Sequence, residues 1–480
     1  MTRAARLGLV AVAGATLASC GGDAPPADPQ LVAQWLRTSL AFARSERIGP
    51  PVAARISAYG SLALYEGYAS DPSSGLASMA GKLNGYGPLP AAPDHSNPDG
   101  AIAAAEAERI VLDSLFRDGF ASTRRTIDSL AKAQIDGRSQ AGVSKPRRDW
   151  GLERGQAIAK TILGWAATDS FFATRGRPWA PKPGRGNWIN TATTDQYVPQ
   201  VLSAQSDMVA PANSGLRMEL ERASEKWVFT NRPKEARPTT LPAFDPVRPT
   251  EPYWGLLRPM TLTNADECAP PPPVPYSEQP GSPFWKQGRE FLDSASALTP
   301  EKKQIALFWA DNPVATGTPG FHWISVVNQM IAKRGLSAPQ AAEVFALTSI
   351  AIHDAFISTW KEKYRSNVVR PVTYVNRVFD PKWVTLFATP PFPEYPSGHS
   401  TLSAAAAKVL GTILGDTIPF VDSTQVDIGH APRAFASFTA ARDEVAISRV
   451  YGGIHYFPAV KDGMVQGECV ASRVLERLAR

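Results

Sequence analysis

Three separated segments decide the fold and the function of this chain: 363-KYRSNVVRP-371, 395-YPSGHS-400 and 448-SRVYGGIH-455. They bring together three basic side chains, Lys363, Arg370 and Arg449, with two histidines, His399 and His455. A guanidinium group donates paired hydrogen bonds to oxygen atoms, and an ammonium group adds a compact positive charge. Histidine serves as acid, base, nucleophile or metal ligand near neutral pH. The segments therefore predict a site that holds a tetrahedral oxyanion and acts on its central atom.

A predicted helix begins beside this site. Ser397 and Gly398 come directly before His399, and the residues that follow, from Ser400 to about Leu414, have a helical composition. The first backbone N–H groups of a helix point outward and favour negative charge. We expect the start of this helix to face the same anion.

The order and spacing of the segments resemble the signature of the type-2 phosphatidic acid phosphatase and vanadium-dependent haloperoxidase superfamily, in particular its bacterial haloperoxidase-like lipoprotein branch. That signature reads Lys, six residues, Arg-Pro; then Pro-Ser-Gly-His; then Ser-Arg, five residues, His, three residues, Asp. The chain matches every position except the last, where Ala459 replaces the Asp. The resemblance is sharp over about residues 300–470 and weaker before them.

The resemblance implies a role for each matching residue. His455 would bind vanadium in a haloperoxidase or act as the nucleophile in a phosphatase, and His399 would transfer protons. The remaining positions would hold the vanadate, or a phosphate in the same place: Lys363, Arg370, Ser397, Gly398 and Arg449. Because Ala459 cannot orient His455, the tautomer of that histidine is in question, and Asp462 is the nearest carboxylate along the chain.

Three functions remain open at this point. The preferred one is a haloperoxidase that oxidises halide with hydrogen peroxide at bound vanadate, since Trp360 and Phe392 stand at the offsets of halide-pocket residues in chloroperoxidase-type members. Core packing explains these two aromatic residues nearly as well. The alternative is an acid phosphatase that hydrolyses phosphomonoesters with His455 as nucleophile. The third is a non-catalytic oxyanion-binding lipoprotein, which the pair of histidines disfavours because binding alone needs only the positive charges.

Composition limits the partners. The chain has 480 residues, 44% of them hydrophobic and 20% charged, and its 43 prolines indicate many loops. The formal net charge is +6, of which Arg3 and Arg6 contribute two charges in the N-terminal segment. No basic stripe with interleaved aromatic residues is present, so nucleic acid is not an expected partner. The oligomeric state cannot be predicted.

The N-terminus predicts export. Two arginines precede an apolar stretch that is too short for a permanent membrane span, and Leu17-Ala-Ser-Cys20 resembles a bacterial lipobox. We expect residues 1–19 to be a signal peptide, residues 20–30 a tether, and Cys20 the lipid acceptor that anchors the chain to a bacterial membrane, facing the periplasm or the exterior. The other two cysteines, Cys268 and Cys469, could form a disulfide in that compartment.

The predicted fold is all-α: packed helical bundles joined by long Pro-rich loops, with the active site in the C-terminal bundle. Amphipathic patterns predict an N-terminal helical domain over residues 31–230 and a catalytic domain over residues 299–480, with a Pro-rich irregular connection over residues 231–298. Residues 432–447 and 459–478 are the last two expected helices, and Arg370-Pro371 is expected in a turn.

The spacing of residues also predicts which side chains lie on the same face of a helix. His353, Phe356, Trp360 and Lys363 share one face of the helix that begins at Ser337. His322 and His353 could support the site, although each is more often a core histidine whose hydrogen bonds are satisfied.

Overall fold

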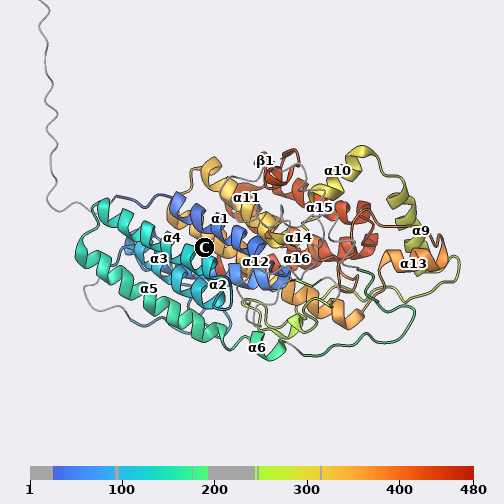
Figure 1. The fold of residues 1–480 in the computed structure, drawn as a ribbon, viewed down its shortest axis with the longest axis horizontal. Helices are drawn as coiled ribbons and strands as arrows, with labels where there is room; N and C mark the ends of the chain where they lie inside the picture. The colour runs from blue at the N-terminus through green and yellow to red at the C-terminus, as the bar shows by residue number, and fades with distance from the viewer. Residues whose placement is uncertain are drawn as a thin grey trace, which may run out of the picture.

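The computed structural model describes residues 25–91, 97–175, 177–192, 244–245, 248–313 and 316–479, and these residues are mostly helical (Figure 1). The prediction of an all-α fold is confirmed. The predicted signal peptide and Cys20 lie outside the described residues, as do residues 193–230 of the expected helical domain and residues 231–243 of the expected irregular connection.

The described helices follow one another as α1 (Gln30–Ser45), α2 (Pro50–Ala69), α3 (Gly100–Leu115), α4 (Ala121–Gln140), α5 (Lys145–Ala166), α6 (Phe171–Thr174), α9 (Pro283–Ser296), α10 (Pro300–Phe308), α11 (Thr318–Arg334), α12 (Ala338–Ser366), α13 (Pro371–Val378), α14 (Gly398–Leu410), α15 (Phe438–Tyr451) and α16 (Phe457–Leu478). A π-helical turn, Gly411–Gly415, continues α14. Within the described ranges the strands are β1 (Phe420–Asp422) and β2 (Arg433–Phe435), which pair antiparallel with Phe420 opposite Phe435.

Local sequence signals set where many helices begin. Ser337 and Gln340 form a capping box at the start of α12, each side chain accepting a backbone N–H of the other residue. The side chain of Thr299 caps α10, and that of Asp99 caps α3. A proline occupies the first helical position of α10 and the second of α12, where its missing N–H costs nothing.

Two helices, α2 and α12, form the centre of the molecule. They pack against each other, and α12 also contacts α14 and α16 (Figure 1). One continuous cluster of buried apolar residues runs from Val32 to Leu478 and includes the apolar residues at the centre of both helices. The division into separate domains stays a prediction. The apolar window of α12 is long enough to span a membrane, but 94% of it is buried inside the protein, as expected of a core helix.

Close packing of α14 against α16 brings two of the sequence segments together. A Cβ atom at Gly467 would lie 2.0 Å from the Thr401 carbonyl oxygen, and one at Gly463 would lie 2.8 Å from that of Ser397. Neither distance is possible for a larger residue, so the two glycines allow the start of α14 to lie against α16 and the His455 loop before it.

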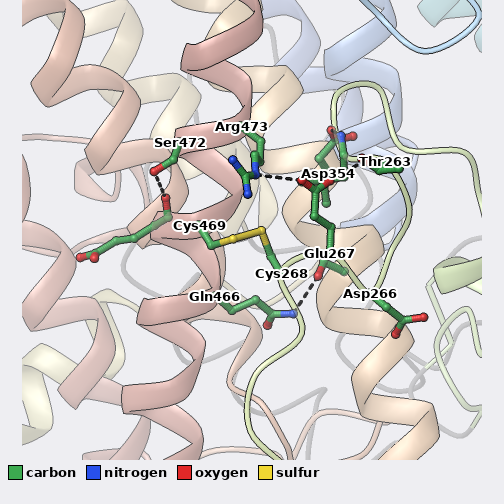
Figure 2. The surroundings of a disulfide bond; sticks show 12 residues. Thr263, Asp266, Glu267, Cys268, Asp354, Gln466, Cys469, Ser472 and Arg473 are labelled. Atoms are coloured by element: carbon green, nitrogen blue, oxygen red, sulfur yellow. Dashed lines mark hydrogen bonds and ion pairs between the residues drawn. A yellow bond between two sulfur atoms is a disulfide. The ribbon is translucent and has the colours of Figure 1, made fainter.

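A disulfide joins the loop that carries Cys268 to α16 (Figure 2). Cys268 and Cys469 are joined, with their Cα atoms 5.8 Å apart. The carboxylate of Asp354 in α12 accepts the backbone N–H groups of Met260, Thr261 and Leu262. The loop before the Pro-rich run is therefore attached to both α12 and α16.

Three local predictions were wrong. The connection over residues 231–298, expected to be irregular, contains helix α9, which the Ser282 side chain caps by accepting the Trp285 N–H. The helix expected from Pro432 begins only at Phe438, where the Ser437 side chain caps the Ala440 N–H, and Arg433–Phe435 form β2 instead. Their partner strand lies more than ten residues away, so a helical pattern could not reveal the pairing. Arg370 is the N-cap of the short helix α13 rather than part of a turn.

Candidate active site

Lys363 lies at the centre of the predicted site, in the last turn of α12, and is completely buried. Its ammonium group donates to three backbone carbonyl oxygens, those of Pro393 at 3.0 Å, Glu394 at 3.0 Å and Pro396 at 2.5 Å. An ammonium has three donors, so all of them are directed at the backbone. Lys363 therefore supplies positive charge and holds the 393–396 segment.

Two guanidinium groups flank Lys363. Arg370 donates from Nε to the Phe392 carbonyl at 3.0 Å and from Nη1 to the Ile454 carbonyl at 2.8 Å. Arg449, in the last turn of α15, donates to the Trp309 carbonyl at 2.5 Å. Each arginine is at most 1% exposed. Burial, together with the charge of Arg370, lowers the pKa of Lys363 well below its usual range, which is the sign of a cation cluster that an anion would stabilise.

The start of α14 adds backbone donors to this cluster. Ser397 is the N-cap, and its hydroxyl accepts the Ser400 N–H at 3.4 Å. The N–H groups of Gly398 and His399 find no backbone acceptor within the described part of the chain. A Cβ at Gly398 would lie 3.8 Å from Lys363 Cε and 3.5 Å from the Trp360 ring, so a larger residue would fill space beside the ammonium group.

His455 faces the cations with one ring nitrogen and a carboxylate with the other. Nδ1 lies 2.9 Å from Glu394 Oε1, and Arg370 Nη1 lies 3.2 Å from Nε2. Burial and the charges of Arg370 and Lys363 lower the pKa of His455 well below its usual range, so the ring is neutral. Burial raises the pKa of Glu394 to about 7 against the opposing charges of Arg370 and Lys363.

The carboxylate nearest in sequence has another partner. Asp462 accepts the Tyr395 hydroxyl at 2.8 Å. Ala459 takes part only through its backbone, since its carbonyl accepts the Ser397 N–H at 2.9 Å.

His399, in the first turn of α14, lines the same cavity as His455. Its Nε2 is 3.8 Å from Asp311 Oδ2 and makes no hydrogen bond with the described protein. Burial and the charge of Arg449 lower the pKa of His399 well below its usual range. A neutral imidazole next to a carboxylate is suited to accept a proton and to return it.

Asp311 is itself held by a buried histidine. His322 places Nδ1 2.8 Å from Asp311 Oδ1 and Nε2 2.8 Å from Asp422 Oδ2. Gln425 also donates to Asp311 Oδ1, at 2.7 Å, and the Trp309 ring stacks on His322 with 4.3 Å between centroids. Burial disfavours the charged ring, but the two carboxylates outweigh it and raise the pKa of His322 to about 10. His322 is therefore an imidazolium between two carboxylates.

The site opens into a narrow cavity of about 40 Å³. Gly398, His399, Arg449 and His455 line its polar end. The aromatic wall consists of Phe356, Trp360 and Phe392; the ring centroids of Trp360 lie 5.0 Å from Phe356 and 4.9 Å from Phe392.

The cavity also reaches into the N-terminal half of the chain. Pro50, at the start of α2, and Phe244 belong to its lining. His353, by contrast, is fully buried against Tyr59 and is no part of the cavity.

Comparison with known proteins places this geometry in a family. A solved structure described as the first bacterial vanadium-dependent iodoperoxidase is 30% identical in sequence and superposes with a TM-score of 0.76, over 95% of this chain and 98% of that one. The chain belongs to the vanadium-dependent haloperoxidase family. The model of the second helical-bundle domain of vanadium chloroperoxidase matches residues 343–480.

Two further relatives are more distant. A holo-type bacterial vanadium-dependent chloroperoxidase shares the fold, with a TM-score of 0.66 and 16% identity over 95% of this chain and 98% of that one. The vanadium chloroperoxidase of Curvularia inaequalis is 30% identical over 173 residues, which cover 31% of this chain and 27% of that relative. The chain thus spans about a quarter of the length of this curated relative.

The site residues fit vanadate, the cofactor of this haloperoxidase family. The three cations offset the charge of an oxyanion, and the Nε2 lone pair of His455 is of the kind that ligates a metal centre. Six of the residues predicted from sequence line one cavity: Trp360, Phe392, Gly398, His399, Arg449 and His455. Lys363 and Arg370 are not part of its lining and contact the segments that carry these residues. Glu394, which directly precedes the 395–400 segment, and Asp311 were missed, because nothing local shows that either carboxylate lies close to a catalytic histidine.

Proposed function

We propose that this chain is a vanadium-dependent haloperoxidase that converts halide, hydrogen peroxide and a proton into hypohalous acid and water. The observation that carries the proposal is the pairing of a neutral, carboxylate-bonded His455 with three buried cations at the end of an aromatic-walled cavity. When bound, vanadate would act as a Lewis acid that activates the peroxide without changing its own oxidation state.

The protein's own residues would balance the charge of the cofactor, position it and transfer protons. Lys363, Arg370 and Arg449 balance the negative charge, and His455 Nε2 fixes the position of the cofactor. His399 takes a proton from peroxide as it binds and returns one to the departing oxygen, with Asp311 stabilising the charged ring in between.

The aromatic wall distinguishes this function from simple hydrolysis. Phe356, Trp360 and Phe392 give a halide an apolar approach to the site and exclude water from it. Removing water lowers the cost of bringing a weakly hydrated anion beside the cations and protects a reactive product.

The second candidate function is phosphomonoester hydrolysis. It is favoured by one observation, since a neutral His455 whose Nε2 carries a lone pair is also suited to attack phosphorus. Here His399 would protonate the leaving alcohol.

A paired assay separates the two functions. Halide oxidation and phosphomonoester hydrolysis are measured on one preparation, with and without orthovanadate. The haloperoxidase proposal expects orthovanadate to raise oxidation and to suppress any hydrolysis. Hydrolysis that is fast without vanadate, together with oxidation that stays flat when it is added, would favour the phosphatase.

We also propose that the chain is exported and anchored to a bacterial membrane through a lipid on Cys20. The lipobox-like residues 17–20 support this proposal.

A further inference from the structure

The carboxylate that contacts His455 comes from an unexpected part of the chain. Glu394 lies 61 positions before His455, in the segment that leads to α14. We propose that Glu394 is the positioning residue of His455 and that it takes over the task of the carboxylate missing at Ala459. This inference deepens the proposed function and rests on it for the meaning of His455 as a ligand.

Hydrogen-bond roles on both sides of the ring select one tautomer. A carboxylate only accepts, so Glu394 requires a proton on Nδ1 of His455. A guanidinium group only donates, so Arg370 requires a lone pair on Nε2. Both contacts therefore select the tautomer with the proton on Nδ1. Its lone pair is on Nε2, the nitrogen that lies close to Arg370.

Glu394 is fixed firmly enough to orient another residue. Its side chain is 1% exposed, and Oε1 accepts the Tyr456 N–H at 3.0 Å in addition to its contact with His455. Its backbone carbonyl accepts a hydrogen bond from Lys363 Nζ, and its backbone N–H donates to the Val368 carbonyl at 3.1 Å. Glu394 thus links the 363–371 segment, through Lys363 and Val368, to the 448–455 segment, through His455.

The alternative carboxylate is excluded by its contacts. The Asp462 carboxylate accepts the hydroxyl of Tyr395, the residue after Glu394, at 2.8 Å, whereas the carboxylate that contacts the His455 ring is that of Glu394. Asp462→Asn is consequently a matched control: it removes one carboxylate charge close to the same histidine without touching the ring.

Binding of two different anions, orthovanadate and sulfate, distinguishes an effect of Glu394 on the orientation of His455 from an effect of its negative charge. Orthovanadate can form a bond to Nε2, whereas sulfate binds through charge and hydrogen bonds alone. Glu394→Gln keeps the shape of the side chain and removes its negative charge, and the loss of a negative charge by itself would tighten the binding of every anion.

The experiment is calorimetric titration of the full chain at pH 8 with orthovanadate and, separately, with sulfate. We expect Glu394→Gln to raise the dissociation constant of orthovanadate about 10–100-fold, the usual effect of losing a partner behind a metal-ligating histidine. Sulfate should bind equally well or more tightly. Asp462→Asn should leave the affinity for orthovanadate within about twofold of wild type. Equal weakening of both anions would overturn the proposal in favour of a general structural role, and tightening of both would show that Glu394 acts only through its charge.

A spectroscopic measurement keeps the inference separate from the proposed function. In vanadate-free protein, the Nδ1 proton of His455 should give a far-downfield proton resonance, because its hydrogen bond to a carboxylate is charge-assisted. The signal is assigned by its loss in His455→Gln, and it should move upfield in Glu394→Gln but not in Asp462→Asn. If wild type binds no vanadate and this shift is still seen, the haloperoxidase proposal fails and the positioning role stands. A signal that Glu394→Gln leaves in place would refute the positioning role itself.

Discussion

Replacement of His322 by Gln tests whether the ring between Asp311 and Asp422 is a true cation. Both ring nitrogens lie 2.8 Å from a carboxylate oxygen, and all three side chains are at most 2% exposed. A neutral imidazole has only one N–H, whereas two ionised carboxylates need two donors. A Gln side chain could satisfy one of them and would leave the other carboxylate buried without its charged partner.

The size of the effect follows from the raised pKa. The pKa of His322 rises from 6.5 to about 10 on folding, which corresponds to at most roughly 5 kcal/mol of unfolding free energy. Because the folded pKa is the higher one, this stabilisation is complete below about pH 6.5 and is lost as pH rises toward 10. Asp422 behaves oppositely: burial opposes its ionisation, but the charge of His322 lowers its pKa, so its contribution is lost in acid.

The assay is denaturant unfolding between pH 6 and 10. Wild type should lose stability steadily above pH 6.5, and His322→Gln should be less stable at pH 6.5 and nearly lack this slope. His430→Gln is the matched control, since His430 is only partly buried and its pKa is lowered, so it should keep the wild-type slope. Parallel curves for wild type and His322→Gln would refute the imidazolium.

Three further results are expected. His399→Ala should retain vanadate, because the cations remain, but should lose halide oxidation about 10²–10⁴-fold; near-wild-type turnover in a steady-state assay would exclude proton transfer by His399. Denatured, unreduced protein should show no free thiol at Cys268 or Cys469, and replacing both with Ala should cost up to roughly 5 kcal/mol of unfolding free energy, because the bond spans 201 residues; two titratable thiols would contradict this. Cys20→Ala should move the protein from the membrane to the soluble fraction, and a variant that stays with the membrane would place the anchor elsewhere.

Much of the fold follows from local sequence. The sequence predicts the start of α12 at Ser337. The predicted face of α12 supplies Phe356 and Trp360 to the cavity lining, but His353 of the same predicted face is no part of it. The start of α10 follows from a similar signal, the Thr299 cap followed by Pro300. These features depend on neighbouring residues, which is why a sequence can reveal them.

The supporting carboxylates could not be predicted in this way. Glu394 reaches His455 across 61 positions, and Asp422 reaches His322 across 100, so both contacts exist only after the helices have packed. Asp422 also depends on the β1–β2 pair, whose strands are too short to give a clear alternating pattern. The sequence signature identifies His399 and His455, but the carboxylates that contact the histidines can be identified only from the tertiary structure.

The most direct test of the central claim follows bound vanadate and halide oxidation in the same samples of wild type and His455→Ala. Each protein is loaded with orthovanadate, dialysed and assayed for retained vanadium and for peroxide-dependent halide oxidation. The account predicts that wild type retains vanadate and oxidises halide, and that His455→Ala loses both properties together. If His455→Ala retains vanadate and oxidises halide like wild type, His455 is not the ligand and the proposed site is wrong.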